Sequence, residues 1–328
     1  MVNKFLIKNS TNLASPTLGT KIHFFSDQFF ADASRILSDS DPVFKEGVFD
    51  DNGKWMDGWE TRRKRIPGHD FIIIKLGKPG RIDDILIDTS FFNGNQPEFA
   101  TIEGCYANNK SLEKAIWINI LNKKKLHPNK KHYFKTNTNK TFNFIRFNIF
   151  PDGGVARLRL FGNIDLVKEK LPKNKFDLAS VLNGSKILAC SDEHFGKAEN
   201  LLSPGKSKNM GNGWETKRRR GPGYDWVILK LGTKGLISHF EIYTHYFKGN
   251  YPSHFSIQVS SSLNTSSIKK IVQESLKWKV ILKDIKLKAN NKLIVKNHFK
   301  PNQYSSLIKL NIYPDGGISR FRVFGTVK

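Results

Sequence analysis

The chain of 328 residues repeats itself once. The segment GWETRRKRIPGHDF at Gly58 returns as GWETKRRRGPGYDW at Gly213, with nine of fourteen positions identical. FNIFPDGGVARLRLFG at Phe147 returns as LNIYPDGGISRFRVFG at Leu310, with ten of sixteen identical. Between these segments, FFNGNQP is answered by YFKGNYP. Because the segments keep their order, a whole domain has been duplicated, and two copies are too few for a solenoid.

Each copy has about 160 residues, an ordinary size for one domain. The first copy ends at the Phe-Gly pair 161–162, and the charged, proline-containing stretch that follows has no counterpart after the second copy. Such a stretch is typical of a linker. We therefore predict a first repeat over residues 1–165, a linker over 166–178 and a second repeat over 179–328.

Apolar residues recur mostly with a period of two, the period of half-buried strands. FIIIKLGKPGRIDDILIDT alternates on both sides of Gly-Lys-Pro-Gly, and its counterpart does so around Gly-Thr-Lys-Gly, which predicts hairpin-like strand pairs. FIRFNIF and LIKLNIY also alternate and then break at Pro-Asp-Gly-Gly, residues that favour a turn. Helical periodicity is weak, apart from a short helix expected over residues 29–37. We predict an all-β fold of two tandem β-sandwiches.

The formal net charge of +25, from 54 Lys and Arg against 29 Asp and Glu, resembles that of a polyanion-binding protein. The lysines are scattered, however, so a solvated basic surface is the favoured interpretation. No apolar stretch approaches the length of a membrane span, and the first residues lack the apolar segment of a secretory signal. We therefore expect a cytoplasmic protein without a membrane partner. Cys105 and Cys190 occupy unrelated places in the two copies, which predicts no disulfide framework.

The two copies of GWET(R/K)R, hereafter the GWET blocks, put an acid and several cations beside a tryptophan. Arginine binds a carboxylate through two hydrogen bonds, and glutamate or histidine can transfer protons. The alternative is a structural Arg–Asp network that joins this segment to the Pro-Asp-Gly-Gly turn, hereafter the PDGG turn. Tyr224 stands in the place of His69, so a proton-transfer role of that histidine would belong to one copy.

The PDGG turns continue as Asp-Gly-Gly-x-x-Arg in both copies. Glycines let a ligand approach the backbone, but the aspartate can equally serve to close the turn. The histidines show no HxH or HxxxH spacing, and the chain has no nucleophile elbow and no phosphate-binding glycine loop. We therefore predict no cofactor and no metal ligand, while a requirement for a divalent metal stays open.

With the GWET blocks, the Gly-Asn-x-Pro blocks (GNxP blocks, residues 94–97 and 249–252) and the PDGG turns in one order and twice over, the chain resembles the allantoicases. The resemblance covers roughly residues 20–326. It implies two jelly-roll domains similar to galactose-binding modules. It also implies hydrolysis of a ureido C–N bond of allantoate, which yields ureidoglycolate and urea in allantoin degradation. A homo-oligomer without a nucleic-acid partner is the expected assembly.

A site for allantoate needs cations for the carboxylate, acceptors for the ureido N–H groups, an acid for the departing urea and a base for water. We expect Arg63 or Arg65 to bind the carboxylate, and Glu60 and His69 to share the proton transfers. The second copy would form a second site, complete one pocket with the first, or serve structure. The candidate catalytic residues are Glu60, His69, Asp70, Glu215 and Asp225, and the candidate substrate-binding residues are Arg63, Arg65, Asp152, Arg157, Arg218, Arg220, Asp315 and Arg320.

Two other functions compete with this hypothesis. A β-sandwich of this kind can be a non-catalytic carbohydrate-binding module, which would release no urea. The other alternative, ranked after the carbohydrate-binding module, is a basic polyanion-binding protein, whose affinity for its ligand would fall steeply with salt concentration.

Overall fold

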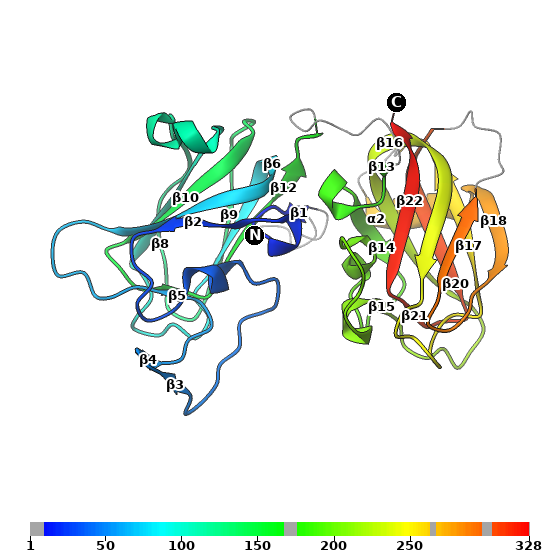
Figure 1. Ribbon diagram of the computed structural model, residues 1–328, viewed down its shortest axis with the longest axis horizontal. Helices are drawn as coiled ribbons and strands as arrows, with labels where there is room; N and C mark the ends of the chain where they lie inside the picture. The colour runs from blue at the N-terminus through cyan, green and yellow to red at the C-terminus, as the bar shows by residue number, and fades with distance from the viewer. Residues whose placement is uncertain (1–9, 167–175, 263–266, 297–303, 328) are drawn as a thin grey trace. The chain divides into compact units, whose positions relative to one another are not determined.

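The computed structural model describes residues 10–166, 176–262, 267–296 and 304–327. The chain divides into two compact units, residues 1–169 (unit 1) and 170–328 (unit 2). Both are built almost entirely of strands (Figure 1). Most of the linker predicted over residues 166–178 lies outside the described residues, so its extent stays a prediction.

The two units contain matching strands in the same order, except that β3 and β4 of unit 1 have no counterpart among the described residues of unit 2. Those of unit 1 are β1 (Thr11–Asn12), β2 (Lys21–Phe25), β3 (Phe49–Asp50), β4 (Gly53–Lys54), β5 (Trp59–Glu60), β6 (Asp70–Asp88), β7 (Phe99–Cys105), β8 (Ile118–Lys125), β9 (Lys131–Lys135), β10 (Phe142–Phe150), β11 (Gly154–Val155) and β12 (Arg157–Ile164). Those of unit 2 are β13 (Phe176–Asp177), β14 (Lys186–Cys190), β15 (Trp214–Glu215), β16 (Asp225–Tyr243), β17 (His254–Ser260), β18 (Lys279–Lys286), β19 (Lys292–Lys296), β20 (Ser305–Tyr313), β21 (Gly317–Ile318) and β22 (Arg320–Val327).

One long strand joins the two layers of each sandwich. The first part of β6 pairs with β2 and β10, and its second part pairs with β9 and β12. Strands β7 and β8 extend the first layer and β1 the second. In unit 2, β16 takes the same position among β14, β20, β19 and β22. The all-β expectation of two tandem jelly-roll sandwiches is confirmed.

The hairpin predicted within each of these long strands is wrong. The register of β6 against β10 shifts at Gly77–Gly80, where the strand turns a corner from one layer to the other. A Cβ on Gly77 would lie 2.0 Å from the carbonyl oxygen of Leu18, so the corner requires a glycine. A half-buried strand alternates in the same way whether it folds back on itself or crosses into a second layer, which is why the sequence pattern suggests a hairpin.

The tryptophans of the GWET blocks fix these blocks to the sandwich. Trp59 and Trp214 are fully buried. Each indole N–H donates a hydrogen bond of 2.8 Å to a backbone carbonyl, that of Asp27 in unit 1 and that of Asp192 in unit 2. A large apolar ring with one satisfied polar group makes a stable anchor, so the charged residues that follow start from a rigid position.

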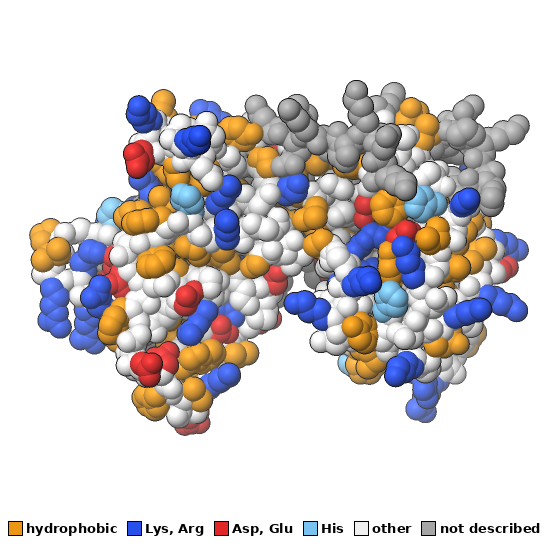
Figure 2. Space-filling model, in the orientation of Figure 1, with side chains coloured by type: hydrophobic (Ala, Val, Ile, Leu, Met, Phe, Trp, Pro, Cys, Tyr) orange, Lys and Arg blue, Asp and Glu red, His pale blue; other side chains and the backbone are white. Residues whose placement is uncertain are grey.

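Helical structure is scarce. The short helix expected over residues 29–37 is a single 3-10 turn, Ala33–Leu37, and α2 (Ile268–Ser275) in unit 2 was not predicted. Among the described residues, no helix has the length and apolar character needed to span a membrane. Lys and Arg side chains are interspersed with apolar and acidic ones over the visible face of both units (Figure 2).

Candidate functional site

The three repeated blocks meet at one end of each unit. In unit 1 the GWET strand β5 pairs with β11, which follows the PDGG turn. The carbonyl of Asn95, in the GNxP block, accepts the N–H of Gly154 at 2.7 Å. In unit 2, β15 pairs with β21 and the carbonyl of Asn250 accepts the N–H of Gly317 at the same distance. The blocks that are far apart in the sequence therefore form one structural cluster per unit.

The second-last residue of each PDGG turn must be glycine for this cluster to form. Gly153 and Gly316 have φ angles of +132° and +128°, a region that disfavours residues with a Cβ. A Cβ on Gly316 would lie 2.6 Å from the carbonyl oxygen of Asn250, and one on Gly153 would lie 2.7 Å from that of Asn95. Glycine thus brings the turn into contact with the GNxP block.

An asparagine holds the glutamate of each GWET block. Asn95 donates a hydrogen bond of 2.8 Å from Nδ2 to Oε1 of Glu60, and Asn250 donates one of 2.5 Å to Oε1 of Glu215. Burial raises the pKa of the Glu60 carboxyl, and the hydrogen bond from Asn95 offsets part of this effect.

Four of the candidate residues line one pocket in unit 2, hereafter the loop pocket. Its volume is about 620 Å³. Glu215 contributes a carboxylate, Arg218 and Arg220 contribute exposed guanidinium groups, and Asp315 belongs to the PDGG turn. The Asp315 carboxylate accepts the backbone N–H of Arg219 at 2.7 Å, which ties the turn to the arginines. The two guanidinium groups can bind the carboxylate of an anionic ligand, and the two acidic side chains can accept hydrogen bonds from its donors.

The corresponding residues of unit 1 are distributed differently. Arg63 and Arg65 line a pocket of about 890 Å³ together with Phe29 and Ile66, but neither Glu60 nor Asp152 lines it. The Asp152 carboxylate accepts the backbone N–H of Lys64 at 2.7 Å, as its counterpart does in unit 2. Unit 1 therefore keeps the scaffold of the cluster while its arginines border another pocket.

The aspartates Asp70 and Asp225 are buried ion-pair partners. Asp70 pairs with Nζ of Lys64 at 2.5 Å, and Asp225 pairs with Nη2 of Arg219 at the same distance. Each also accepts a hydrogen bond from a serine hydroxyl of the strand-end loop, Ser26 in unit 1. These ion pairs fix the cationic segment to the start of β6 or β16. They differ from the Arg–Asp network to the PDGG turn that the sequence left open, because the aspartates of that turn, Asp152 and Asp315, accept backbone N–H groups of the segment.

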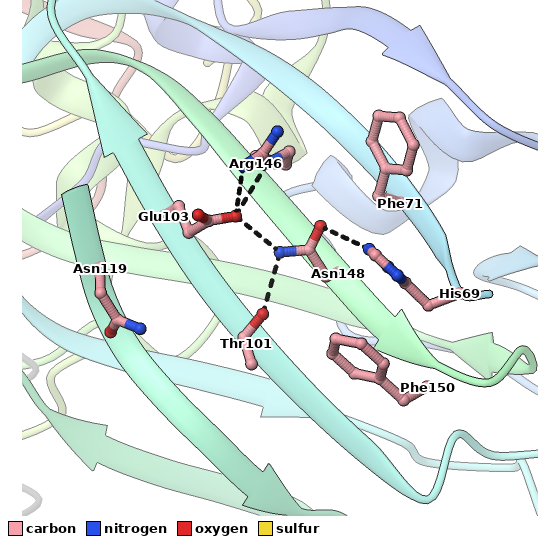
Figure 3. A pocket seen from close by; sticks show the side chains of 8 residues that line it. All are labelled: His69, Phe71, Thr101, Glu103, Asn119, Arg146, Asn148 and Phe150. Carbon is pink, nitrogen blue, oxygen red and sulfur yellow. Dashed lines mark hydrogen bonds and ion pairs between the residues drawn. The ribbon is translucent and has the colours of Figure 1, made fainter. Parts of the chain in front are cut away.

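The candidate histidine lies in a separate place. The exposed ring of His69 stacks on Phe150 with centroids 4.6 Å apart and lines a pocket on the outer face of the sheet formed by β6, β10, β7 and β8 (Figure 3). Glu60 does not line this pocket. In unit 2, Tyr224 packs against Tyr313 at 5.0 Å. The structure does not bring the histidine to the glutamate.

The arginines of the Asp-Gly-Gly-x-x-Arg motifs are also outside the loop pocket. Arg157 is 1% exposed, donates to the carbonyls of Ser40 and Asp57, and pairs with the Asp57 carboxylate at 2.6 Å. Arg320 is equally buried and donates to the carbonyl and side chain of Asn212. Burial, with the nearby charge of Arg322, lowers the pKa of Arg320 to about 10. Both guanidinium groups therefore stabilise loops of their own unit through these hydrogen bonds.

Sequence reasoning missed the two asparagines, as well as Tyr251 and Ser253, which line the loop pocket. The signal for the asparagines was present, because the GNxP block occurs in both copies and an amide is a natural partner of a carboxylate. Within the described residues, no three His, Cys, Asp or Glu side chains come together in a way that could hold a metal ion.

Comparison with known proteins gives a consistent result. The family model described as the allantoicase repeat matches residues 11–165 and 176–328. A probable allantoicase of Acinetobacter baumannii (strain SDF) is 45% identical over 322 residues, 98% of this chain and 95% of that protein. One of Pseudomonas fluorescens (strain SBW25) is 47% identical over 318 residues, 96% of both chains. The crystal structure of allantoicase from Saccharomyces cerevisiae superposes with a TM-score of 0.81 at 33% identity, covering 98% of this chain and 95% of that chain.

Proposed function

The chain belongs to the allantoicase family and hydrolyses allantoate to ureidoglycolate and urea, and we propose that the loop pocket of unit 2 binds the substrate. The observation that carries this proposal is the convergence of Glu215, Arg218, Arg220 and Asp315 on one pocket of about 620 Å³. A pocket of this size accommodates a small molecule.

The chemistry of the pocket fits the groups of allantoate. The substrate is an anion with one carboxylate and two ureido groups on a central carbon. Arg218 and Arg220 bind the carboxylate, because a guanidinium offers parallel N–H donors to its two oxygens. The Glu215 carboxylate, held by Asn250, accepts a hydrogen bond from a ureido N–H. The central carbon then lies between the cations and the acid.

Glu215 carries the proton transfers in this proposal. Hydrolysis forms a bond between the water oxygen and the central carbon and breaks the bond from that carbon to one ureido nitrogen. The nitrogen gains a proton and departs as urea, while water loses a proton. A single carboxyl group that gives one proton and takes the other balances the reaction.

Unit 1 contributes less to turnover under this proposal. It retains the Glu60–Asn95 hydrogen bond, yet Arg63 and Arg65 line a pocket that Glu60 does not line. We also propose the homo-oligomer and the cytoplasmic location expected from the sequence; light scattering tests the assembly and fractionation of the cells tests the location.

Glu215→Gln tests the proposal, with Glu60→Gln as the matched variant in the other unit. Glutamine keeps the shape of the side chain and removes its proton exchange. We expect Glu215→Gln to lower kcat for urea release roughly 100-fold or more, the scale of general acid–base catalysis, and Glu60→Gln to lower it by less than half. Circular dichroism confirms folding. Full urea release by a folded Glu215→Gln protein would overturn the assignment.

A further inference from the structure

The pocket on the outer sheet face of unit 1, hereafter the sheet-face pocket, is the second polar cavity with converging side chains. Its volume is about 340 Å³. It shares no residue with the loop pocket. Its lining comes from β7, β8, β10, the start of β6 and the residue before it. The lining residues are His69, Phe71, Thr101, Glu103, Asn119, Arg146, Asn148 and Phe150 (Figure 3).

A buried asparagine organises the floor of this pocket. Asn148 is 4% exposed, and its Nδ2 donates to Oγ1 of Thr101 at 2.9 Å and to Oε2 of Glu103 at 3.0 Å. The two N–H groups of the Asn148 amide are thus donated to Thr101 and Glu103. The amide oxygen of Asn148 lies on the other side, 3.3 Å from Nε2 of His69. Nε2 of His69 therefore carries a proton. The same Oε2 accepts Nε of Arg146 at 2.8 Å.

These contacts leave the other oxygen of Glu103 for a ligand. Oε2 accepts from Arg146 and Asn148, whereas Figure 3 shows the other carboxylate oxygen pointing away from both. Asn119 stands directly opposite Glu103 on the neighbouring strand and is exposed. A carboxylate oxygen and an amide from neighbouring strands thus line the same pocket, whose lining also includes the rings of Phe71 and Phe150.

The charges of the floor cancel. Burial opposes ionisation of Glu103, but hydrogen bonds from Arg146 and Asn148 outweigh it and hold the pKa of this carboxyl below its usual range. Ionised Glu103 and Arg146 form an ion pair at 2.8 Å. The sheet-face pocket therefore suits an uncharged ligand.

Unit 2 keeps the buried asparagine but lacks the charged and amide side chains around it. Nδ2 of Asn311 donates to Oγ of Ser256 at 3.0 Å and to Oε1 of Gln258 at 3.1 Å. Gln258 stands at the register position of Glu103, and its Nε2 donates to the carbonyls of Ser275 and Trp278. Val280 replaces Asn119 opposite it. Lys309, 1% exposed, takes the position of Arg146. The carboxylate and the facing amide are specific to unit 1.

We propose that the sheet-face pocket binds the ureido group of an uncharged ligand, of which urea, the product of the reaction, is the smallest. The N–H groups of a planar ureido group donate to the outward oxygen of Glu103, and its carbonyl accepts from the Asn119 amide. The choice of a ureido ligand rests on the reaction that the family catalyses. The existence of this binding site does not depend on whether the loop pocket binds allantoate.

Saturation-transfer NMR with N-methylurea tests this proposal, because the methyl group gives a clear signal. Tetramethylurea is the control ligand, since it keeps the planar carbonyl and has no N–H donor, and glycerol represents polyols. Asn119→Val introduces the residue found in unit 2 at an exposed position, and Val280→Asn is the matched control. Glu215→Gln reports on the loop pocket.

We expect saturable binding of N-methylurea to the native protein, to Val280→Asn and to Glu215→Gln. Binding should weaken roughly tenfold in Asn119→Val and in Glu103→Gln, the loss expected for one hydrogen bond. Equal binding of tetramethylurea or glycerol, or unchanged binding by Asn119→Val, would overturn the proposal. Loss of urea release by Glu215→Gln with intact N-methylurea binding separates this site from the loop pocket.

Discussion

At the scale of single residues, identical residues of the two copies can lie in different environments. The glutamates and arginines of the GWET blocks were predicted as site residues because glutamate can transfer protons and arginine can bind a carboxylate. The roles of Arg157 and Arg320 could not be predicted, because an arginine that binds a ligand and one that binds loop carbonyls have the same local sequence. The difference is burial, which arises from loops more than a hundred residues away.

Asn250→Asp tests whether the asparagine positions the carboxyl of Glu215, the residue proposed to transfer protons. The change puts a second carboxylate within hydrogen-bond distance of Glu215, and a neighbouring like charge raises the pKa of a carboxyl. We expect the pH dependence of kcat/KM for urea release to shift upward by about one pH unit. The matched variant Asn95→Asp should leave the profile nearly unchanged. A profile that is the same in Asn250→Asp and the native protein would contradict this role.

Cys105 should resist thiol reagents in the folded protein. It is 1% exposed, and burial raises the pKa of its thiol to about 11, which keeps it protonated and unreactive near neutral pH. In Cys190→Ser, where Cys105 is the sole thiol, we expect no labelling by a chromogenic disulfide at pH 8 until denaturant is added. Complete labelling of the native variant within minutes would show that this thiol is accessible.

At the scale of elements, periodicity predicted the strands well and their connections less well. Alternation along residues 71–89 correctly indicates half-buried strand on both sides of the glycines. It does not reveal that β6 serves two layers, because the pairing partners β10 and β12 lie more than 50 residues further along. The close approach of the PDGG turn to the GNxP block likewise depends on the assembled sandwich.

Gly316→Ala should disrupt this approach. The new Cβ would lie 2.6 Å from the carbonyl of Asn250, at a φ of +128°. We expect unit 2 to lose about 1–3 kcal/mol of stability and urea release to fall as Asn250 moves from Glu215. Denaturant unfolding and kcat measure the two effects. Gly221→Ala is the control, since nothing lies within 4 Å of its Cβ position. Equal kcat values in the two variants would refute the link.

At the scale of the whole molecule, duplication is the property that the sequence displays most directly. Repeated segments in constant order require two copies of one domain, and the two units indeed have the same strand order. The reaction could not be predicted from periodicity or charge, because one fold supports many functions. It followed from the resemblance, and the net charge of +25 pointed elsewhere.

The two buried arginines allow the contribution of each unit to activity to be separated. Removing Arg157 leaves the Asp57 carboxylate unpaired in unit 1, and removing Arg320 leaves the carbonyl and side chain of Asn212 without their donor in unit 2. Breaking a buried ion pair costs about 3–5 kcal/mol, so Arg157→Ala should lower the calorimetric unfolding temperature of unit 1. Arg320→Ala should lower that of unit 2.

Activity should follow the unit that holds the loop pocket. We expect the temperature at which urea release is lost to fall with the unfolding transition in Arg320→Ala. In Arg157→Ala, urea release should persist above the lowered transition of unit 1, because Glu215, Arg218 and Arg220 all belong to unit 2. If inactivation instead tracks the lowered transition in Arg157→Ala, turnover requires a folded unit 1, and the assignment of catalysis to unit 2 alone is wrong.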